Sequence, residues 1–278
     1  TSGHATERDW QIGFRYRNGS FQSKAGKLFG VDTAGKQLPI SSPNTKVYLP
    51  IGNCLMGHID GSDAMALAWM HSAGVTQMIG YTVPTWYGYG GWGLLDYFVE
   101  QPGRYTFSEA FYANHQALLH RLETNFPGLA GTEAQAINEK IEETQQSRNH
   151  GLTANDARGL LYDRDTVAFY GDPAWQALMA PDVCAFNIEF TQRGNRYVLK
   201  IKPRDKKSFE AVNTNGSQRG GRPIVRLFPQ RIDVKSLKIV AGAELAPMIT
   251  DNFLLVPLPE KSAPEQAYRV ELEARTLP

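Results

Sequence analysis

Two hydrophobic patterns divide the chain near residue 180. Before that point, residues 46–53 form an apolar run that predicts a buried strand, Ser62 is a candidate N-cap for a helix, and residues 75–83 predict a second strand. A strand, a helix and a strand within about 35 residues predict a βαβ unit with a parallel pair of strands. Ligands bind beyond the carboxyl ends of such strands, and Cys54 lies at one of these ends.

An aromatic and glycine-rich segment, "YTVPTWYGYGGWGLLDYF", follows the second strand over residues 81–98. Seven of its 18 residues are aromatic and four are glycine. Glycine at this density disfavours regular structure, so we expect a loop that carries large flat side chains. The alternative is an aromatic plug of the core, since aromatic residues dominate burial. Next, "TFSE" predicts a capping box from Thr106 to Glu109 that opens a helix, and "TVAFYGD" predicts a short strand.

From about residue 181 the helical period disappears. The segment "CAFNIEFTQRGNRYVLKIK" alternates apolar and polar positions on both sides of a turn, which predicts an antiparallel hairpin with one buried face. Further short apolar runs follow at regular spacing, as is typical of a β-sandwich. The sequence therefore predicts an α/β domain over residues 1–180 and a sandwich over residues 181–278.

Composition and charge exclude few classes of function. The chain has 278 residues, 42% of them hydrophobic and 21% charged, and a formal net charge of +1. No apolar run reaches the roughly 18 residues that a membrane span needs, and the chain shows no signal peptide. Residues 1–180 carry 13 basic against 17 acidic side chains, whereas residues 181–278 carry 16 against 11. The net charge of the whole chain does not indicate a membrane or a nucleic acid as a partner, although the second half is the more basic.

The two cysteines, Cys54 and Cys184, are too few for a disulfide framework and fall in different predicted domains. A cysteine nucleophile needs a base that is distant in the chain and adjacent in the fold. Of the six histidines, His4 is the best candidate because small residues surround it in "SGHAT", as at a strand end that opens into a loop. The alternatives are that Cys54 is a small buried residue and that His4 is merely solvated.

Three segments taken in order, "SGHATERDW", "YLPIGNCLMG" and "MIGYTVPTWYG", resemble the gingipain family of cysteine peptidases, with "FYGDP" as a weaker later match. The resemblance covers residues 1–105. It implies a caspase-like three-layer αβα domain with a largely parallel sheet, followed by an immunoglobulin-like antiparallel β-sandwich. It also implies an enzyme, a thiol-dependent endopeptidase that acts on peptides or proteins through an acyl-enzyme, at a secreted or cell-surface location.

The resemblance assigns roles to particular residues. His4 would be the general base and Cys54 the nucleophile. The backbone N–H groups of Ala5 and Cys54 would form the oxyanion hole. The substrate pocket would be lined by four residues: Ser2, Gly52, Tyr81 and Trp86.

Three departures from the family pattern generate further expectations. Ala5 stands where the family has glycine, which would be costly if that position needs a positive φ. The connection from His4 to Cys54 is longer than usual and is expected to form a flap. The family builds part of its sheet before the histidine, so we expect an upstream segment or a second chain to complete the sheet. No cofactor is required by this interpretation, although structural calcium is compatible with the family.

Other interpretations remain open at the level of sequence. In "HIDGSD", His58, Asp60 and Asp63 offer ligands for a hard cation, although helix capping explains the carboxylates more simply. Residues 193–231 hold 11 basic and two acidic side chains, so the sandwich could bind an anionic partner. A peptidase-like chain without activity, acting as a scaffold or binding protein through this basic face, is the alternative function.

Overall fold

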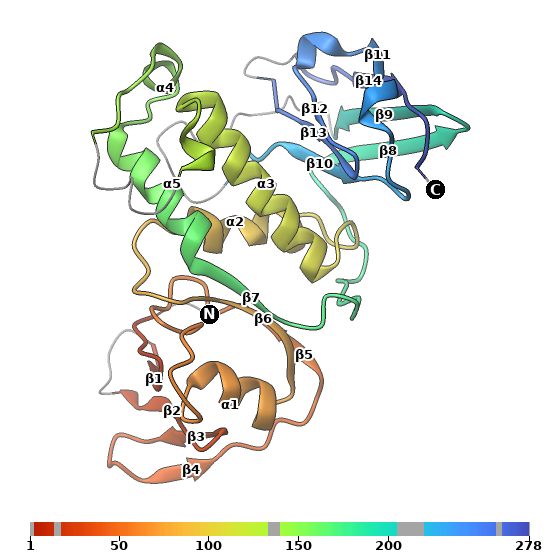
Figure 1. Ribbon diagram of the computed structural model, residues 1–278. Helices are drawn as coiled ribbons and strands as arrows, with labels where there is room; N and C mark the ends of the chain where they lie inside the picture. Colours follow the sequence, from red (N-terminus) through yellow and green to blue (C-terminus); the bar gives the residue numbers. More distant parts are fainter. Residues whose placement is uncertain (1–2, 14–17, 133–139, 205–219, 260–262, 278) are drawn as a thin grey trace.

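The computed structural model describes residues 3–13, 18–132, 140–204, 220–259 and 263–277. Figure 1 shows three parts: a lobe that holds β1–β4 and α1, a layer formed by α2, α3 and α5, and a β-rich part formed by β8–β14. A small sheet, β5–β6–β7, lies between the lobe and the helical layer. The predicted mixture of α/β structure and antiparallel β-structure is therefore observed.

The elements that precede the β-rich part are mostly short. The strands are β1 (Asp9–Gln11), β2 (Ser20–Lys24), β3 (Lys27–Val31), β4 (Gln37–Pro39), β5 (Lys46–Tyr48), β6 (Val75–Tyr81) and β7 (Val167–Gly171). The α-helices are α1 (Met65–Ser72), α2 (Tyr89–Phe98), α3 (Phe107–Asn125), α4 (Gln145–Asn149) and α5 (Ala154–Thr166), and η2 (Leu129–Gly131) is a 3₁₀ turn.

The sheet β5–β6–β7 is mixed. β5 and β6 are parallel and are joined through α1, which confirms the predicted βαβ unit, although α1 begins after Ala64 with no side-chain cap from Ser62. β7 pairs antiparallel with β6. The expectation of a largely parallel sheet is therefore wrong for the described residues, because the third strand returns from α5 in the opposite direction.

Alternate residues of this sheet face two separate cores. One face packs against α2 and α3 through Val47, Ile79 and Phe169. The other face packs against α1 and the β1–β4 sheet through Tyr48, Met78 and Tyr170. Because side chains alternate along a strand, three short strands bind helices on both faces, and three layers result.

The predicted aromatic loop is in part a helix, α2. Its glycines are sites of close packing: a Cβ on Gly91 would lie 2.8 Å from the Tyr81 ring, and one on Gly93 would lie 2.2 Å from Asn114. Asp163 accepts the Gly90 N–H at 2.8 Å at the start of the helix. Tertiary contacts thus overcome the low helix propensity of glycine, and the expectation of a loop is wrong for residues 89–98.

The connection from His4 to Cys54 is a small sheet rather than a flap. Strands β1 to β4 form an antiparallel meander. The rings of Trp10 and Phe21 stack at 5.0 Å, and both pack near Trp69 of α1. An aromatic cluster therefore attaches the meander to the βαβ unit.

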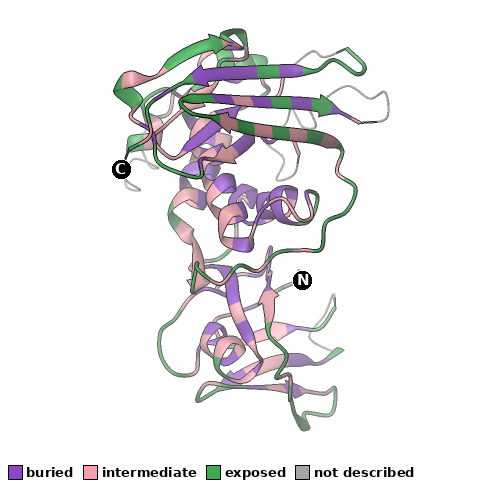
Figure 2. Cartoon of the chain, turned by 90° about the vertical axis from the view of Figure 1, so that its right-hand side faces the viewer, coloured by how far each residue is buried: buried purple, intermediate pink, exposed green. Residues whose placement is uncertain are grey.

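The C-terminal part contains two antiparallel sheets that share one core. Its elements are β8 (Phe186–Arg193), β9 (Arg196–Pro203), β10 (Ile224–Leu227), η4 (Val234–Ser236), β11 (Lys238–Ala241), η5 (Ala243–Leu245), β12 (Met248–Ile249), β13 (Phe253–Val256) and β14 (Tyr268–Glu273). The sheet orders are β11–β14–β9–β8 and β10–β13–β12. Buried and exposed residues alternate along β9, as Figure 2 shows, so the predicted hairpin and the packing of two sheets are both observed.

Candidate functional site

Cys54 lies in the turn that follows β5, and backbone hydrogen bonds hold this turn against the end of β6. Leu55 donates its N–H to the Val83 carbonyl at 3.3 Å, and Gly57 donates to the Tyr81 carbonyl at 2.9 Å. The approach is so close that a Cβ on Gly57 would lie 2.6 Å from the Gly80 carbonyl oxygen. The carboxyl ends of two parallel strands therefore fix the position of Cys54.

The Cys54 thiol contacts the segment that leaves β6. The Thr85 N–H donates to Cys54 Sγ at 3.3 Å, and the thiol is free and partly exposed. The position is therefore compatible with a nucleophile, and Cys54 is not a fully buried core residue.

Trp86 directly follows Thr85, the residue whose N–H contacts this thiol. Its side chain is 48% exposed, and its ring packs edge-on against Tyr162 with centroids 5.6 Å apart. The Tyr162 hydroxyl donates to the Pro84 carbonyl at 2.6 Å, which ties α5 to the Trp86 segment. Burial raises the pKa of Tyr162, and the charges of Asp163 and Cys54 act in the same direction. The indole and the phenol thus contact each other, and the segment that carries the indole also contacts the thiol.

The turn around Cys54 is conformationally unusual. Gly52 has a φ of 76°, which glycine adopts without cost, whereas Leu55 has a φ of 58°. A leucine in the left-handed region is uncommon and costs energy that the surrounding contacts must supply. Gly52 is partly exposed two residues before the thiol, which is compatible with the predicted floor of a pocket.

Asn53 is a residue that sequence analysis missed. It is fully buried, and neither its amide nitrogen nor its amide oxygen has a hydrogen-bond partner among the described residues. An unpaired buried amide costs about 1–3 kcal/mol. Its position directly before Cys54 was visible in "GNC", but no local pattern marks a buried polar group that lacks a partner.

The segment around His4 packs onto the segment around Cys54. Ala5 belongs to the same buried cluster as Tyr48 of β5 and Met56 of the Cys54 turn. His4 itself is exposed, its carbonyl accepts the Gln11 N–H at 3.1 Å, and its side chain makes no hydrogen bond to Cys54. The fold therefore brings the two segments together without forming a His–Cys hydrogen bond.

Both backbone N–H groups that were predicted to form the oxyanion hole lack a hydrogen-bond acceptor among the described residues. The N–H groups of Ala5 and Cys54 donate to no described residue. Ala5 is not among the residues with positive φ. Ala5 therefore carries no strain from a positive φ.

Tyr81 lies behind the site rather than in the pocket where sequence analysis placed it. Its side chain is 1% exposed, and its hydroxyl accepts the Gly91 N–H at 3.2 Å beneath α2. Burial raises the pKa of the neighbouring Asp163 to about 6, against the opposing effect of backbone N–H groups at the start of α2. Tyr81 is thus closed off by the helix that begins after the Trp86 loop. Ser2, the remaining predicted pocket residue, lies outside the described residues.

The three possible cation ligands in "HIDGSD" contact protein groups instead. Asp60 forms an ion pair with Arg8, Asp63 accepts the Ala25 N–H at 2.7 Å, and His58 Nδ1 lies 3.1 Å from the Thr82 carbonyl oxygen. Among the described residues, no group of three or more His, Cys, Asp or Glu side chains is arranged to hold a metal ion. These contacts favour a structural role for the segment.

Several basic residues of the predicted basic face are neutralised by carboxylates. The pairs are Arg196 with Glu271, Lys200 with Glu189, Arg222 with Asp96, and Arg231 with Asp251. Arg222 is buried against α2 rather than displayed on a surface. Residues 205–219, which hold part of the basic sequence, lie outside the described residues.

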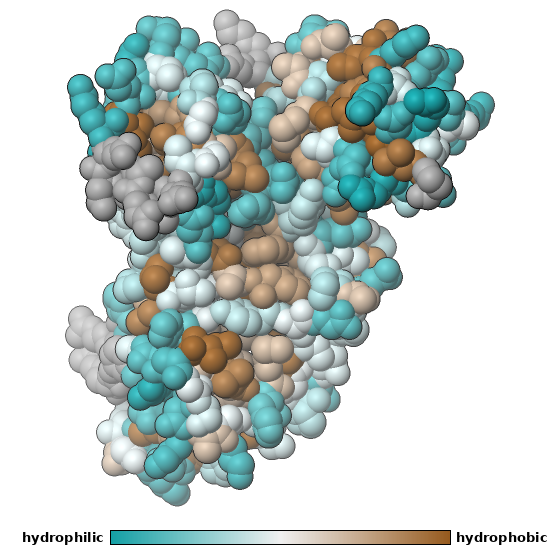
Figure 3. Space-filling view, in the orientation of Figure 1, coloured by the Kyte–Doolittle hydropathy of each residue, from teal (hydrophilic) through white to brown (hydrophobic). Residues whose placement is uncertain are grey.

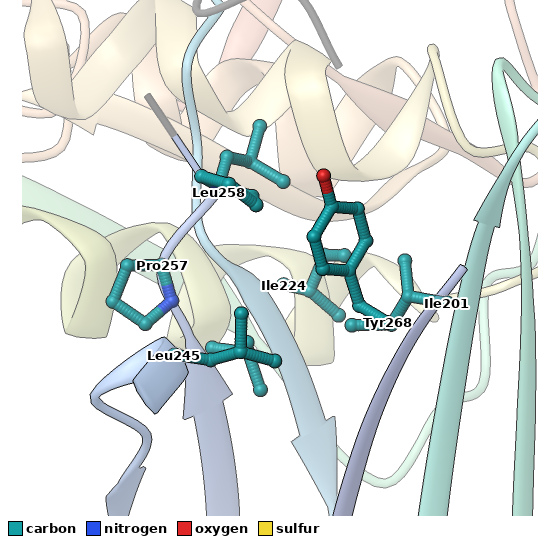
Figure 4. A pocket seen from close by; sticks show the side chains of 8 residues that line it. Ile201, Ile224, Leu245, Pro257, Leu258 and Tyr268 are labelled. Carbon is teal, nitrogen blue, oxygen red and sulfur yellow. The ribbon is translucent and has the colours of Figure 1, made fainter. Parts of the chain in front are cut away.

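Two cavities lie in or beside the β-rich part, and Cys54 lines neither. One is an apolar space of about 10 Å³ inside the paired sheets, where Figure 4 shows Leu245, Ile224 and Tyr268 around it. That volume is about one water probe and excludes a substrate. The other, of about 160 Å³, lies between the segment just before α3 and the strands β8 and β10. In the space-filling view, hydrophobic residues gather across the middle of the visible face, between the β1–β4 lobe and the helical layer (Figure 3).

Comparisons with protein-family models, with curated proteins and with solved structures found no match to this chain. Among the described helices, none combines the length and the apolar character needed to cross a membrane.

Proposed function

We propose that the chain is a cysteine endopeptidase with Cys54 as its nucleophile. The observation that carries the proposal is the position of the thiol: it lies at the carboxyl end of a βαβ unit and accepts the N–H of Thr85, the residue before the exposed Trp86. Ligands bind beyond the carboxyl ends of parallel strands such as β5 and β6. The exposed indole would hold the side chain that precedes the scissile bond.

The proposed reaction proceeds through a thioester. His4 takes the thiol proton, and the thiolate adds to the carbonyl carbon of the peptide bond. The N–H groups of Ala5 and Cys54 then stabilise the oxyanion. The C–N bond breaks, the amine leaves with the proton from His4, and an acyl group remains on Cys54. Water then gives a proton to His4 and adds to the thioester carbon. The C–S bond breaks, the carboxylic acid product leaves, and the sulfur takes back the proton from His4.

His4 must approach the thiol for this chemistry, because its side chain is exposed and unbonded to Cys54 in the structure. Hydrogen bonds between catalytic groups are often long in the free enzyme and tighten when substrate binds. The shared packing of Ala5, Tyr48 and Met56 keeps the two segments adjacent. A peptide bound along Trp86 would complete the arrangement.

Two observations favour activity over the role of an inactive scaffold. Ala5 has no positive φ, so the departure from the family glycine carries no strain. The ion pairs of Arg196 and Lys200 with carboxylates reduce the positive charge of the sandwich face. The finer fold assignment, a caspase-like domain before an immunoglobulin-like sandwich, and a secreted or cell-surface location are parts of this proposal through the resemblance alone.

Alkylation of Cys54 by iodoacetamide from pH 5 to 9 tests the proposal. A Cys184→Ser background removes the second thiol, and His4→Ala is compared with His58→Ala, which removes a histidine near Cys54 in sequence. We expect rapid labelling at pH 6 in the parent and in His58→Ala, and labelling about tenfold or more slower in His4→Ala. Slow labelling at the same rate in all three proteins would overturn the proposal. Hydrolysis of a peptide library would then define the substrate.

A further inference from the structure

Three segments line the cavity of about 160 Å³: residues 104–105 just before α3, strand β8 and strand β10. Its lining residues are Arg104, Tyr105, Ile188, Phe190, Val225 and Arg226. Two of the six are arginines and none is acidic. The walls are therefore partly aromatic and strongly positive.

Arg226 is a cation without a partner among the described residues. Its guanidinium lies over the Phe190 ring, 5.1 Å from the centroid, and Nε is buried without a hydrogen bond. The side chain forms no ion pair with a described residue. A charge withdrawn from water is costly unless an opposite charge or hydrogen bonds compensate it. Arg226 is partly buried, and its guanidinium therefore has hydrogen-bond donors available to an anion.

Arg104 supplies a second charge, held in a fixed position by neutral groups. It donates from Nη1 to Gln101 Oε1 at 2.6 Å and from Nη2 to the Phe186 carbonyl at 2.8 Å. Burial lowers the pKa of Arg104, and Arg226 acts in the same direction, so the two cations are close enough to repel each other. The neutral partners orient the guanidinium without cancelling its charge.

We propose that this cavity binds a small oxyanion, a carboxylate or a phosphate group, between Arg104 and Arg226. Guanidinium groups recognise both oxyanions through paired N–H donors. Phe190 and Ile188 would contact an apolar part of the ligand, and a cavity of about 150 Å³ is large enough for one benzene-sized ring. The site is separate from Cys54, which does not line the cavity, so it does not depend on the peptidase proposal.

The test uses the full chain and two probes, inorganic phosphate and benzoate, each titrated at constant ionic strength. Binding is measured by calorimetry and by the shift in Tm. Arg226→Met removes the charge and keeps an unbranched side chain against Phe190. Lys238→Gln removes one charge from exposed β11, at the opposite edge of the sheet from β8, and serves as the matched control.

We expect saturable binding of at least one probe to the parent and to Lys238→Gln, with the dissociation constant raised about tenfold or more in Arg226→Met. Tighter binding of phosphate would identify a phosphate site, and tighter binding of benzoate a carboxylate site. If Arg226→Met does not fold, Arg104→Gln replaces it with the same expected loss. The proposal would be overturned if neither probe bound saturably. It would also be overturned if the arginine variant and Lys238→Gln had equal affinity.

Discussion

Gly57 and Gly80 approach each other so closely that a Cβ on either residue would lie 2.6 Å from the backbone of the other. Gly57 follows Cys54 in the turn after β5, and Gly80 lies near the end of β6. The hydrogen bond from the Gly57 N–H to the Tyr81 carbonyl requires this separation. The position of the candidate nucleophile therefore depends on two residues that have no side chains.

The first prediction concerns Gly80→Ala. The added methyl group must push the Cys54 turn away from β6, and overpacking of this kind destabilises proteins by about 1–3 kcal/mol. We expect a lower Tm and a changed rate of Cys54 alkylation. Gly61→Ala is the control, because a Cβ there meets nothing within 4 Å. Equal stability and equal labelling in the two variants would contradict the importance of the contact.

The second prediction separates substrate binding from thiol chemistry. Trp86→Ala removes an indole that is 48% exposed, so the Tm should change little. Iodoacetamide is too small to depend on contact with the Trp86 indole. Its rate of reaction with Cys54 should therefore stay within about twofold of the parent. Because the proposed pocket uses the Trp86 indole to bind a peptide side chain, kcat/KM for peptides should fall about tenfold or more.

Leu178→Ala provides the comparison for that experiment. Leu178 is a similarly exposed apolar residue, 52% accessible, on the segment that bridges to Thr106. Its removal should leave kcat/KM unchanged. An unaltered kcat/KM in Trp86→Ala would exclude the indole from the substrate pocket.

Sequence patterns correctly predicted the secondary-structure elements that depend on residues close together in the chain. The capping box of Thr106 and Glu109 is present at the start of α3, because two side chains three residues apart satisfy each other's N–H groups. The hairpin β8–β9 follows from alternation around a turn. The proximity of Cys54 to the Trp86 segment was also predictable, since successive parallel strands end at one edge.

Features that depend on distant residues escaped prediction. The helix α2 exists because Tyr81, Asp163 and Asn114 pack against its glycines, and none of these contacts is visible in the local sequence. The helix α5 carries a capping box at Thr153 and Asp156 that could have been recognised. The contact of Tyr162 with Trp86 could not, because it requires α5 to return against the sheet.

The third prediction is a pH dependence of stability that comes from Asp163. Burial raises its pKa from 3.8 to about 6 in the folded protein, so the folded state holds this proton more tightly than the unfolded chain does. As pH rises from 4 to 6, the unfolded chain releases its proton first, and the free energy of unfolding falls. The loss attributable to this carboxyl is roughly 3 kcal/mol and is complete above about pH 6.

Asp163→Asn tests that prediction. Asparagine keeps an oxygen that accepts the Gly90 N–H but does not titrate. Urea unfolding at half-unit intervals from pH 4 to 7 should show a smaller decline of stability in the variant than in the parent. Parallel curves for the two proteins would show that Asp163 does not govern stability in this range.

The fourth prediction concerns Asn53, the buried amide directly before Cys54. Because neither polar atom has a partner among the described residues, Asn53→Ala removes an unsatisfied group and should cost less stability than an ordinary buried truncation, or even raise the Tm. If the amide instead finds its partner in bound substrate, kcat/KM should fall while iodoacetamide labelling of Cys54 stays constant.

Ser147→Ala provides the comparison. The Ser147 side chain is buried and its hydroxyl donates to the Thr144 carbonyl at 3.0 Å, so its removal should lower stability and leave kcat/KM unchanged. A large loss of stability in Asn53→Ala would mean that the amide is satisfied in solution, and the strained turn at Leu55 would then be the better explanation of how Cys54 is held.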